Sequence, residues 1–170
     1  MTSQGVLRAQ AEDDLARLAR GLEERLTGGT AFFEALDEAL RTPYWYRVLL
    51  FWYLDEFPTR PRPVVSGKFG IGFATWLAGS EFGRYMPFVL VLPGDLRHNV
   101  LPPLGYRPTQ VEFAFLDDSY YRGRTYGQIK HGLEECGGKM LGALVLYDGS
   151  VEAPVHPSVF RYHGQQEGKT

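Results

Sequence analysis

The sequence is poor in three things: cysteine, net charge and long apolar runs. Its 170 residues include one cysteine, Cys136, so the chain can form neither an internal disulfide nor a cysteine-based zinc site. A chain with so little cysteine is typical of a reducing compartment, and we expect a cytoplasmic protein. The formal net charge is −2. Proteins that bind nucleic acid polymers are usually basic, so this charge disfavours that class of partner.

Long apolar runs are also missing. The most apolar window, residues 44–54, contains Arg47 and is followed by two acidic residues. It is therefore shorter than the roughly 20 residues that cross a bilayer. Residues 1–10 carry no apolar stretch of the kind found in signal peptides, and we expect no membrane partner. What the chain does have is a 44% hydrophobic composition, which is enough for a globular core.

Hydrophobic periodicity predicts helices in the first third of the chain. Leucines at helical spacing predict a helix over residues 6–26. Thr30 is expected to cap a second helix that runs to about Arg41. The apolar stretch 44–57 has the length of a buried helix, which we favour, although its aromatic and β-branched content also allows a strand.

Short apolar runs and helical segments alternate in the rest of the chain. We expect strands at 64–65, 87–92, 111–116, 141–147 and 159–162, and helices at 73–82 and from about 125 to 135. Cys136 follows the last helix and is expected to be a small buried side chain. Residues 93–110 are rich in proline and are expected to form a long loop. This alternation predicts an α/β fold with a mostly parallel sheet.

The chain divides into three parts on this pattern. We expect an N-terminal helical region over residues 1–61, an α/β core over 62–163 and a flexible tail over 164–170. In parallel sheets, ligands bind beyond the carboxyl ends of the strands. Two loops that carry glycines and charges, 66–72 and 117–125, are expected at that edge. Because glycine is favoured where backbone approaches a ligand closely, these loops are the candidate ligand site.

The second of these loops carries the most informative motif. An apolar strand delivers Asp117 and Asp118, and a tight loop leads from them to Thr125 at the start of a helix. Backbone N–H groups at a helix N-terminus bind phosphate, and carboxylates accept hydrogen bonds from sugar hydroxyls. The combination suits a phosphorylated sugar, with the acids on its hydroxyls and the amides and Thr125 on its phosphate.

This motif resembles that of the type I phosphoribosyltransferases, in which an apolar strand, two acids and four further residues precede Gly-x-Thr. Here Leu116-Asp117-Asp118 is followed by residues 119–122 and by Gly123-Arg124-Thr125, in register without a gap. The resemblance covers roughly residues 62–148. It implies a parallel-sheet, phosphoribosyltransferase-like core with a variable hood. It also implies an enzyme of nucleotide metabolism, a transferase that moves a phosphoribosyl group from 5-phosphoribosyl 1-diphosphate (PRPP) to a small acceptor and releases pyrophosphate.

The resemblance further implies roles for individual residues. Asp117 and Asp118 would hold the ribose hydroxyls and meet the cofactor Mg²⁺ only indirectly, because the ion is bound mainly through PRPP. The implied 5-phosphate site is the turn after these acids: Tyr121, Arg122, Gly123, Arg124 and Thr125. The implied pyrophosphate site follows the first core strand: Ser66, Gly67, Lys68 and Phe69. The loop that would close over PRPP offers three candidates: Arg97, His98 and Arg107.

The sequence departs from the family pattern at two positions of the motif. Many purine-salvage members carry an acid near the base where this chain has Tyr121, and the residue before the loop glycine is commonly threonine rather than Arg122. Both departures argue against a 6-oxopurine acceptor. Residues 30–57 and 148–163 are the expected source of the hood. They leave the acceptor open, with a nucleobase as one candidate, and a homodimer is one option for the assembly.

Two other functions stay open from the sequence alone. One is a non-catalytic PRPP or nucleotide sensor on the same fold, with Tyr121 and Arg122 as signs of lost activity. The other is a Rossmann dinucleotide-binding protein, because three glycines follow the strand at 64–65. However, their spacing in 66–72 is the reverse of Gly-x-Gly-x-x-Gly, and this function leaves 117–125 unexplained.

Overall fold

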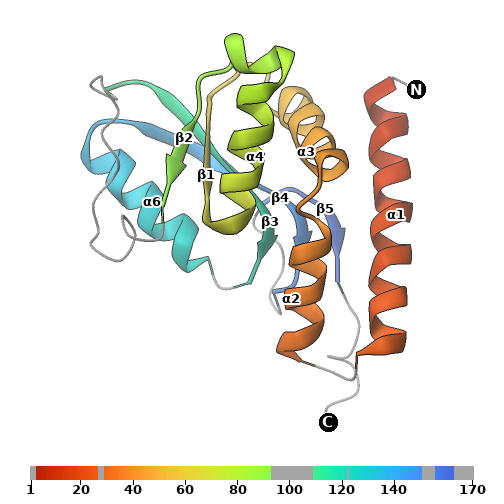
Figure 1. The fold of residues 1–170 in the computed structure, drawn as a ribbon. Coiled ribbons are helices and arrows are strands. Elements are labelled where there is room, and N and C mark those ends of the chain that lie inside the picture. Colours follow the sequence, from red (N-terminus) through yellow and green to blue (C-terminus); the bar gives the residue numbers. More distant parts are fainter. Residues whose placement is uncertain (1–2, 27–28, 93–108, 122, 151–155, 163–170) are drawn as a thin grey trace.

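One parallel sheet forms the centre of the molecule (Figure 1). The computed structural model describes residues 3–26, 29–92, 109–121, 123–150 and 156–162. Within these residues, five strands lie in the order β2-β1-β3-β4-β5, and all neighbours are parallel. The strands are β1 (Arg62–Ser66), β2 (Val89–Val91), β3 (Glu112–Tyr120), β4 (Lys139–Asp148) and β5 (Ser158–Arg161). The predicted α/β fold with a parallel sheet is confirmed, and the carboxyl ends of the strands share one edge.

Helices cover both faces of this sheet. They are α1 (Ser3–Arg25), α2 (Thr30–Ala39), α3 (Pro43–Glu56), α4 (Gly67–Gly79) and α6 (Arg124–Glu135), with a short 3-10 helix, η1 (Glu81–Arg84), after α4. Ala114 and Leu116 of β3 belong to the core that α1 to α4 form. The alternate residues, Phe113 and Phe115, belong to a second core with Ile129 of α6. Both faces are therefore buried, as is usual for an all-parallel sheet.

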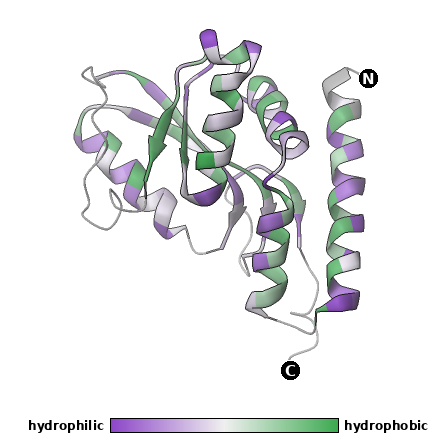
Figure 2. Cartoon of the chain, in the orientation of Figure 1, coloured by the Kyte–Doolittle hydropathy of each residue, from purple (hydrophilic) through white to green (hydrophobic). Residues whose placement is uncertain are grey.

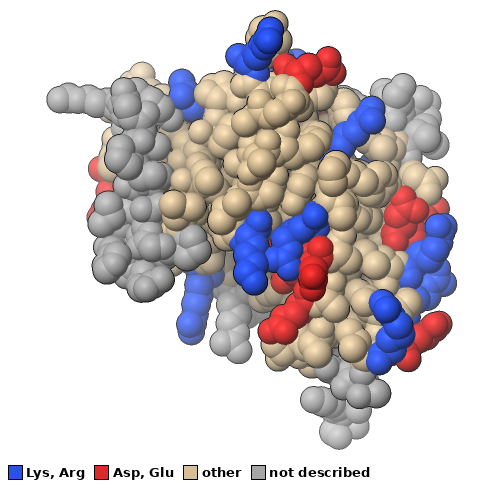
Figure 3. Space-filling model, in the orientation of Figure 1, with Lys and Arg blue, Asp and Glu red and all other residues tan. Residues whose placement is uncertain are grey.

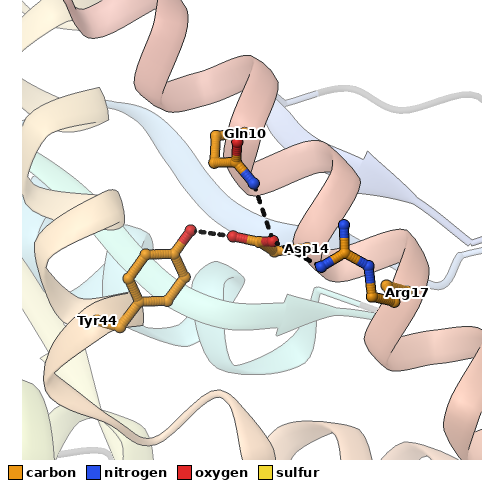
Figure 4. A network of polar contacts seen from close by, with 4 residues as sticks. All are labelled: Gln10, Asp14, Arg17 and Tyr44. Atoms are coloured by element: carbon orange, nitrogen blue, oxygen red, sulfur yellow. Dashed lines mark hydrogen bonds and ion pairs between the residues drawn. The ribbon is translucent and has the colours of Figure 1, made fainter.

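The N-terminal helix α1 packs against α3 and β5 and keeps one face in water. Hydrophobic and hydrophilic residues alternate around it (Figure 2), and Leu15 on its inner side is fully buried. A polar network joins it to α3 (Figure 4). There the hydroxyl of Tyr44 donates to Asp14, which also accepts a hydrogen bond from Gln10 at 3.1 Å and lies 3.7 Å from Arg17. The N-terminal helices are thus built onto the sheet rather than separate from it.

The apolar stretch at 44–57 is a helix, α3, and not a strand. Pro43 opens it in the first turn, where the missing N–H of proline leaves no helical hydrogen bond unmade. Trp45, Leu49 and Trp52 are among its buried residues, and they lie between α1 and the sheet side of the core. The favoured prediction is confirmed. Apolar residues lie all around α3 because neighbouring elements pack on several of its sides. The sequence of α3 therefore lacks the one-sided hydrophobic pattern that marks an amphipathic helix.

Three local predictions are wrong. Thr30 is the first residue of α2 and caps nothing, because Gly29 occupies the N-cap position with a φ of 69°. Cys136 is exposed, because it lies where the chain leaves the last turn of α6 on the solvent side. The third strand continues beyond Leu116 to Tyr120, because β4 pairs with it as far as Tyr120↔Asp148.

Some predictions fall on parts of the chain that the structure does not cover. The expected tail, 164–170, and most of the expected long loop, 93–108, lie outside the described residues. Among the helices that the structure does describe, none combines the length and the apolar character that a membrane span needs. The boundaries at residues 61 and 163 stay predictions.

Candidate functional site

The first turns of α4 and α6 begin at the same edge of the sheet (Figure 1). Their preceding strands, β1 and β3, are parallel neighbours, with Val64 opposite Phe115. Each helix starts at a glycine with positive φ, 66° at Gly67 and 72° at Gly123. The free N–H groups of the two helix starts therefore gather at one edge, where a bound anion is stabilised.

Both predicted acids lie inside β3, close to its carboxyl end. Asp118 is buried, with 8% of its surface exposed, whereas Asp117 is partly exposed. The backbone N–H of Asp118 donates to Asp117 Oδ1 at 2.8 Å, and the Ser119 hydroxyl donates to Asp118 Oδ1 at 3.2 Å. Although side chains alternate along a strand, the two carboxyl groups stay within hydrogen-bond reach of each other at the end of β3.

Two clefts open at this edge, and Asp117 and Thr125 line both of them. The first has a volume of about 280 Å³ and is lined by Asp37, Arg41, Ser66, Gly67, Lys68, Phe69, Asp117, Asp118 and Thr125. The second has a volume of about 290 Å³ and is lined by Phe115, Asp117, Ser119, Tyr120, Tyr121, Gly123, Arg124, Thr125 and Tyr126. The structure thus brings the residues of the implied pyrophosphate and 5-phosphate sites to either side of the acids.

The turn between β3 and α6 is shorter than expected. Tyr120 still belongs to the strand, and Gly123 takes the left-handed conformation directly before the helix. A Cβ at Gly123 would collide with the Tyr120 hydroxyl unless that side chain moved, and the φ of 72° favours glycine at this position. Of the other predicted residues, Arg122 and the three loop candidates Arg97, His98 and Arg107 lie outside the described residues.

The other predicted loop, 66–72, is largely not a loop. Helix α4 begins at Gly67, so Lys68 and Phe69 lie in its first turn. A Cβ on Gly70 would lie 2.9 Å from the backbone carbon of Val65, and one on Gly72 would collide with the Tyr46 hydroxyl. These two glycines let α4 pack closely on β1 and α3. Only Gly67, with its positive φ and open space around it, has the character expected of a ligand-binding turn.

Sequence reasoning missed two residues of the first cleft, Asp37 and Arg41. Asp37 lies in the last turn of α2, Arg41 follows just beyond the end of this helix, and α2 lies beside the carboxyl ends of β3, β4 and β5 (Figure 1). Basic side chains meet acidic ones in the middle of this face, where α2 approaches the start of α4 (Figure 3). Only the i, i+4 spacing of an acid and a base could have signalled them, and that spacing is common on exposed helices.

Burial raises the pKa of all three carboxyl groups in the first cleft. Withdrawal from water raises the pKa of Asp37 to about 7, and the charge of Asp118 adds to the shift. Burial and the neighbouring Asp118 raise the pKa of Asp117 well above its ordinary value. Burial also raises the pKa of Asp118, opposed by its hydrogen bonds and by the charge of Arg41. Three acids so close together favour a ligand that donates hydrogen bonds or brings positive charge.

The carboxyl groups fit an Mg²⁺ ion only if the ligand supplies most of its oxygens. No group of three or more metal-binding side chains is present in the part of the chain that the structure describes. Mg²⁺ typically binds through one or two carboxylates together with waters and substrate phosphates. Asp117, which is partly exposed, and Asp118, which is buried, both line the first cleft. They would supply the one or two carboxylates that Mg²⁺ needs when a diphosphate beside them supplies the other oxygens.

Comparison with known proteins places the fold. No protein-family model matches the chain, and no curated protein is significantly similar to it. The purine phosphoribosyltransferase from Pyrococcus horikoshii Ot3 is 15% identical, with a TM-score of 0.50 over 71% of this chain and 85% of that one. The adenine phosphoribosyltransferase from Rhodothermus marinus DSM 4252 is 17% identical, with a TM-score of 0.50 over 72% and 82%. The chain has the phosphoribosyltransferase fold.

A third solved structure extends this comparison. The UMP synthase of Leishmania donovani is 13% identical, with a TM-score of 0.52, over 75% of this chain and 29% of that larger one. The resemblance of the sequence motif to the phosphoribosyltransferases is thus matched by the fold over 71–75% of the chain. At such identities the likeness is one of fold, so the activity has to be argued from the site.

Proposed function

We propose that this chain is a phosphoribosyltransferase that uses PRPP and Mg²⁺ and releases pyrophosphate. The observation that carries the proposal is the joint position of two acids and two glycine-initiated helix starts around adjoining clefts on a phosphoribosyltransferase fold. Acids, amides and clefts together match the three parts of PRPP, which are a diol, a phosphate and a diphosphate. A helix N-terminus alone, or a pair of acids alone, would not be enough to propose PRPP as the ligand.

Each part of PRPP has its own residues in this proposal. Asp117 and Asp118 accept hydrogen bonds from the ribose hydroxyls, and the turn from Tyr121 to Thr125 binds the 5-phosphate through backbone N–H groups. The diphosphate lies against Ser66, Gly67 and Lys68 at the start of α4. The second cleft then holds the phosphate end, and the first cleft holds the sugar, the diphosphate and the approach of the acceptor.

The reaction is displacement of pyrophosphate from the anomeric carbon of the ribose by the acceptor. The bond from that carbon to the diphosphate oxygen breaks, and positive charge develops on the ring. The carboxylates of Asp117 and Asp118 lie on the sugar side, where they stabilise this charge and orient the ring. When bound, Mg²⁺ supplies positive charge to the departing diphosphate.

Pyrophosphate release tests the proposal. The protein is incubated with PRPP and Mg²⁺ and, separately, with adenine, hypoxanthine, orotate or uracil, and pyrophosphate is measured. We expect PRPP to bind and at least one acceptor to trigger release. Binding of PRPP without any release would favour a non-catalytic sensor, and absence of PRPP binding would overturn the proposal. Tight binding of NAD without an effect of PRPP would instead support a dinucleotide-binding protein.

A further inference from the structure

The hood helix α2 places a carboxyl group where the sequence motif lacks one. The motif has Tyr121 at the position where many purine-salvage members have an acid. The Tyr121 hydroxyl does not reach the first cleft; it hydrogen-bonds with the hydroxyl of Tyr147 on β4. The Tyr147 hydroxyl in turn donates to Asp37 Oδ1 at 2.5 Å. A short row of polar groups thus leads from the motif turn to the carboxyl group of Asp37.

Asp37 is held in one orientation by its surroundings. Aromatic rings pack beside it, with Phe33 of α2 at 5.1 Å from the ring of Tyr121 and 6.4 Å from that of Tyr147, measured between centroids. The Tyr147 hydroxyl donates to Oδ1, the Ser119 hydroxyl also hydrogen-bonds to the carboxyl group, and Asp37 still lines the first cleft. A carboxyl group that hydroxyl donors orient at the wall of a cleft is suited to a directed hydrogen bond with a ligand.

Charged groups surround Asp37 on three sides. Asp117 and Asp118 lie on the β3 side, Arg41 lies just beyond the end of α2, and Tyr147 and Tyr121 are the titratable neighbours on the remaining side. The nearby acids keep Asp37 from ionising as readily as a surface carboxyl group, whereas Arg41 favours its charged form. The described part of the chain contains no hydrogen-bond or ion-pair partner for the Arg41 guanidinium, so that group is open to a ligand too.

We propose that Asp37 is the acceptor-binding acid of this protein and takes the proton that a ring N–H of the acceptor loses during transfer. This inference rests on the proposed function. The acceptor is then a planar nitrogen heterocycle that donates an N–H to Asp37 and offers an acceptor group to Arg41. Its nitrogen forms the bond to the anomeric carbon as the diphosphate leaves with the bonding electron pair. The N–H proton passes to the carboxylate of Asp37.

Asp37 differs from the sugar-binding acids in what its loss should change. Asp37→Asn keeps the size of the side chain and the hydrogen bond from Tyr147 but cannot take a proton. We expect it to lower kcat/KM for the acceptor by about 100-fold, the usual contribution of a general base. PRPP affinity, measured by calorimetry in the presence of Mg²⁺, should stay within about threefold, because Asp117 and Asp118 remain. The exposed neighbour Glu38 provides the matched control, and Glu38→Gln should leave both quantities unchanged.

A pH profile separates proton transfer from simple positioning. Because the pKa of Asp37 is raised to about 7, kcat/KM of the wild-type protein should rise with pH through that region, and Asp37→Asn should lose the rise. Asp37→Glu should restore part of the rate. Unchanged acceptor kinetics in Asp37→Asn, with an active wild-type protein, would overturn the inference alone. PRPP binding without turnover of adenine, hypoxanthine, orotate or uracil would count against the proposed transferase as well. Failure of the wild-type protein to bind PRPP would overturn the proposed function itself.

Discussion

The two strand-to-helix junctions of the site use the same backbone device but differ in chemistry. At both, a glycine with positive φ sits where the helix begins, 66° at Gly67 and 72° at Gly123. The β1–α4 junction adds one exposed base, Lys68, and no acid. The β3–α6 junction is preceded by Asp117 and Asp118. One junction is therefore suited to an anion alone, and the other to a phosphorylated sugar.

The comparison also separates two kinds of glycine. Gly67 lies in open space, so what glycine provides there is the backbone conformation. Gly70, one turn further along α4, has an ordinary helical conformation and is needed because the backbone of Val65 is too close for any side chain. A glycine-rich stretch can thus contain a proposed binding residue, Gly67, and a packing residue, Gly70, three positions apart. Their φ angles and the space around them distinguish the two.

The largest expected effect contrasts the acids of one junction with the base of the other. Asp117→Asn combined with Asp118→Asn removes two charge-assisted hydrogen bonds, each of which contributes about 1.5–3 kcal/mol. We therefore expect PRPP binding to weaken by roughly 100-fold or more. Lys68→Ala should weaken it by less than about tenfold, because an exposed ammonium contributes little. Both are measured by calorimetry with PRPP and Mg²⁺.

The control for this contrast lies on the same strand. Glu112→Gln changes one charge at the opposite end of β3, where Glu112 lies 3.9 Å from Lys139, and it should leave PRPP binding unchanged. Circular dichroism should show that all these variants keep the fold. If the double variant bound PRPP as tightly as the wild-type protein, the assignment of the sugar site would be wrong.

The next effect tests the two kinds of glycine. Gly70→Ala forces a methyl group against the backbone of Val65, and such overpacking costs about 1–3 kcal/mol of unfolding free energy. Its PRPP affinity, measured below the melting temperature, should stay near that of the wild-type protein. Gly67→Ala costs about 1 kcal/mol through its positive φ and should weaken PRPP binding roughly tenfold, or about 1.4 kcal/mol. If Gly70→Ala weakened PRPP binding and Gly67→Ala did not, Gly70 would be the binding residue and the assignment of Gly67 would be wrong.

The smallest effect concerns pH and the acids near the β3–α6 junction. Burial holds the pKa of Asp37 at about 7 in the folded protein, above its ordinary value of 3.8, so folding favours the protonated form. This stabilisation is present at low pH and is lost as pH rises toward and through 7. Asp37→Asn should flatten that decline by on the order of 1 kcal/mol, after allowance for screening of a partly exposed group. Urea unfolding at pH 5 and pH 8 measures it, and an unchanged slope would contradict the expected shift.

Much of the fold follows from the sequence because local signals agree with the global arrangement. The alternation of apolar runs and helical segments predicts the parallel sheet, and the motif from Leu116 to Thr125 predicts which edge binds a ligand. The extent of β3 and the start of α4 could not be predicted. Residues from Asp117 to Tyr120 are polar or aromatic, and only pairing with β4 keeps them in the strand. The glycines after Ser66 suggest a loop in the sequence. Only the structure shows that Gly70 and Gly72 lie in a helix, where Val65 and Tyr46 leave no room for larger side chains.

The proposed acceptor side of the site was harder to predict than the proposed sugar side. Asp37 belongs to the amphipathic helix α2 and Arg41 follows its end, far in sequence from the motif. The charges of such a helix are expected to face water. What makes Asp37 unusual is the tyrosine from β4 that donates to it, 110 positions further along the chain. Contacts of this kind depend on how α2 docks on the sheet, which no local pattern records.

The docking of α1 on the last strand has a consequence for how the protein folds. Arg8 donates to the carbonyl of Ser158 across 150 positions, and the Tyr162 hydroxyl donates to Glu23 across 139. Contacts of such long range form late and slow the search for the native topology. During synthesis, α2 and α3 emerge early enough to cover part of α1, whereas the contact between α1 and β5 forms only after residues 158–161 have been made. The surface of α1 that β5 covers is exposed until then, so newly made chains should depend on chaperones more than their size alone would suggest.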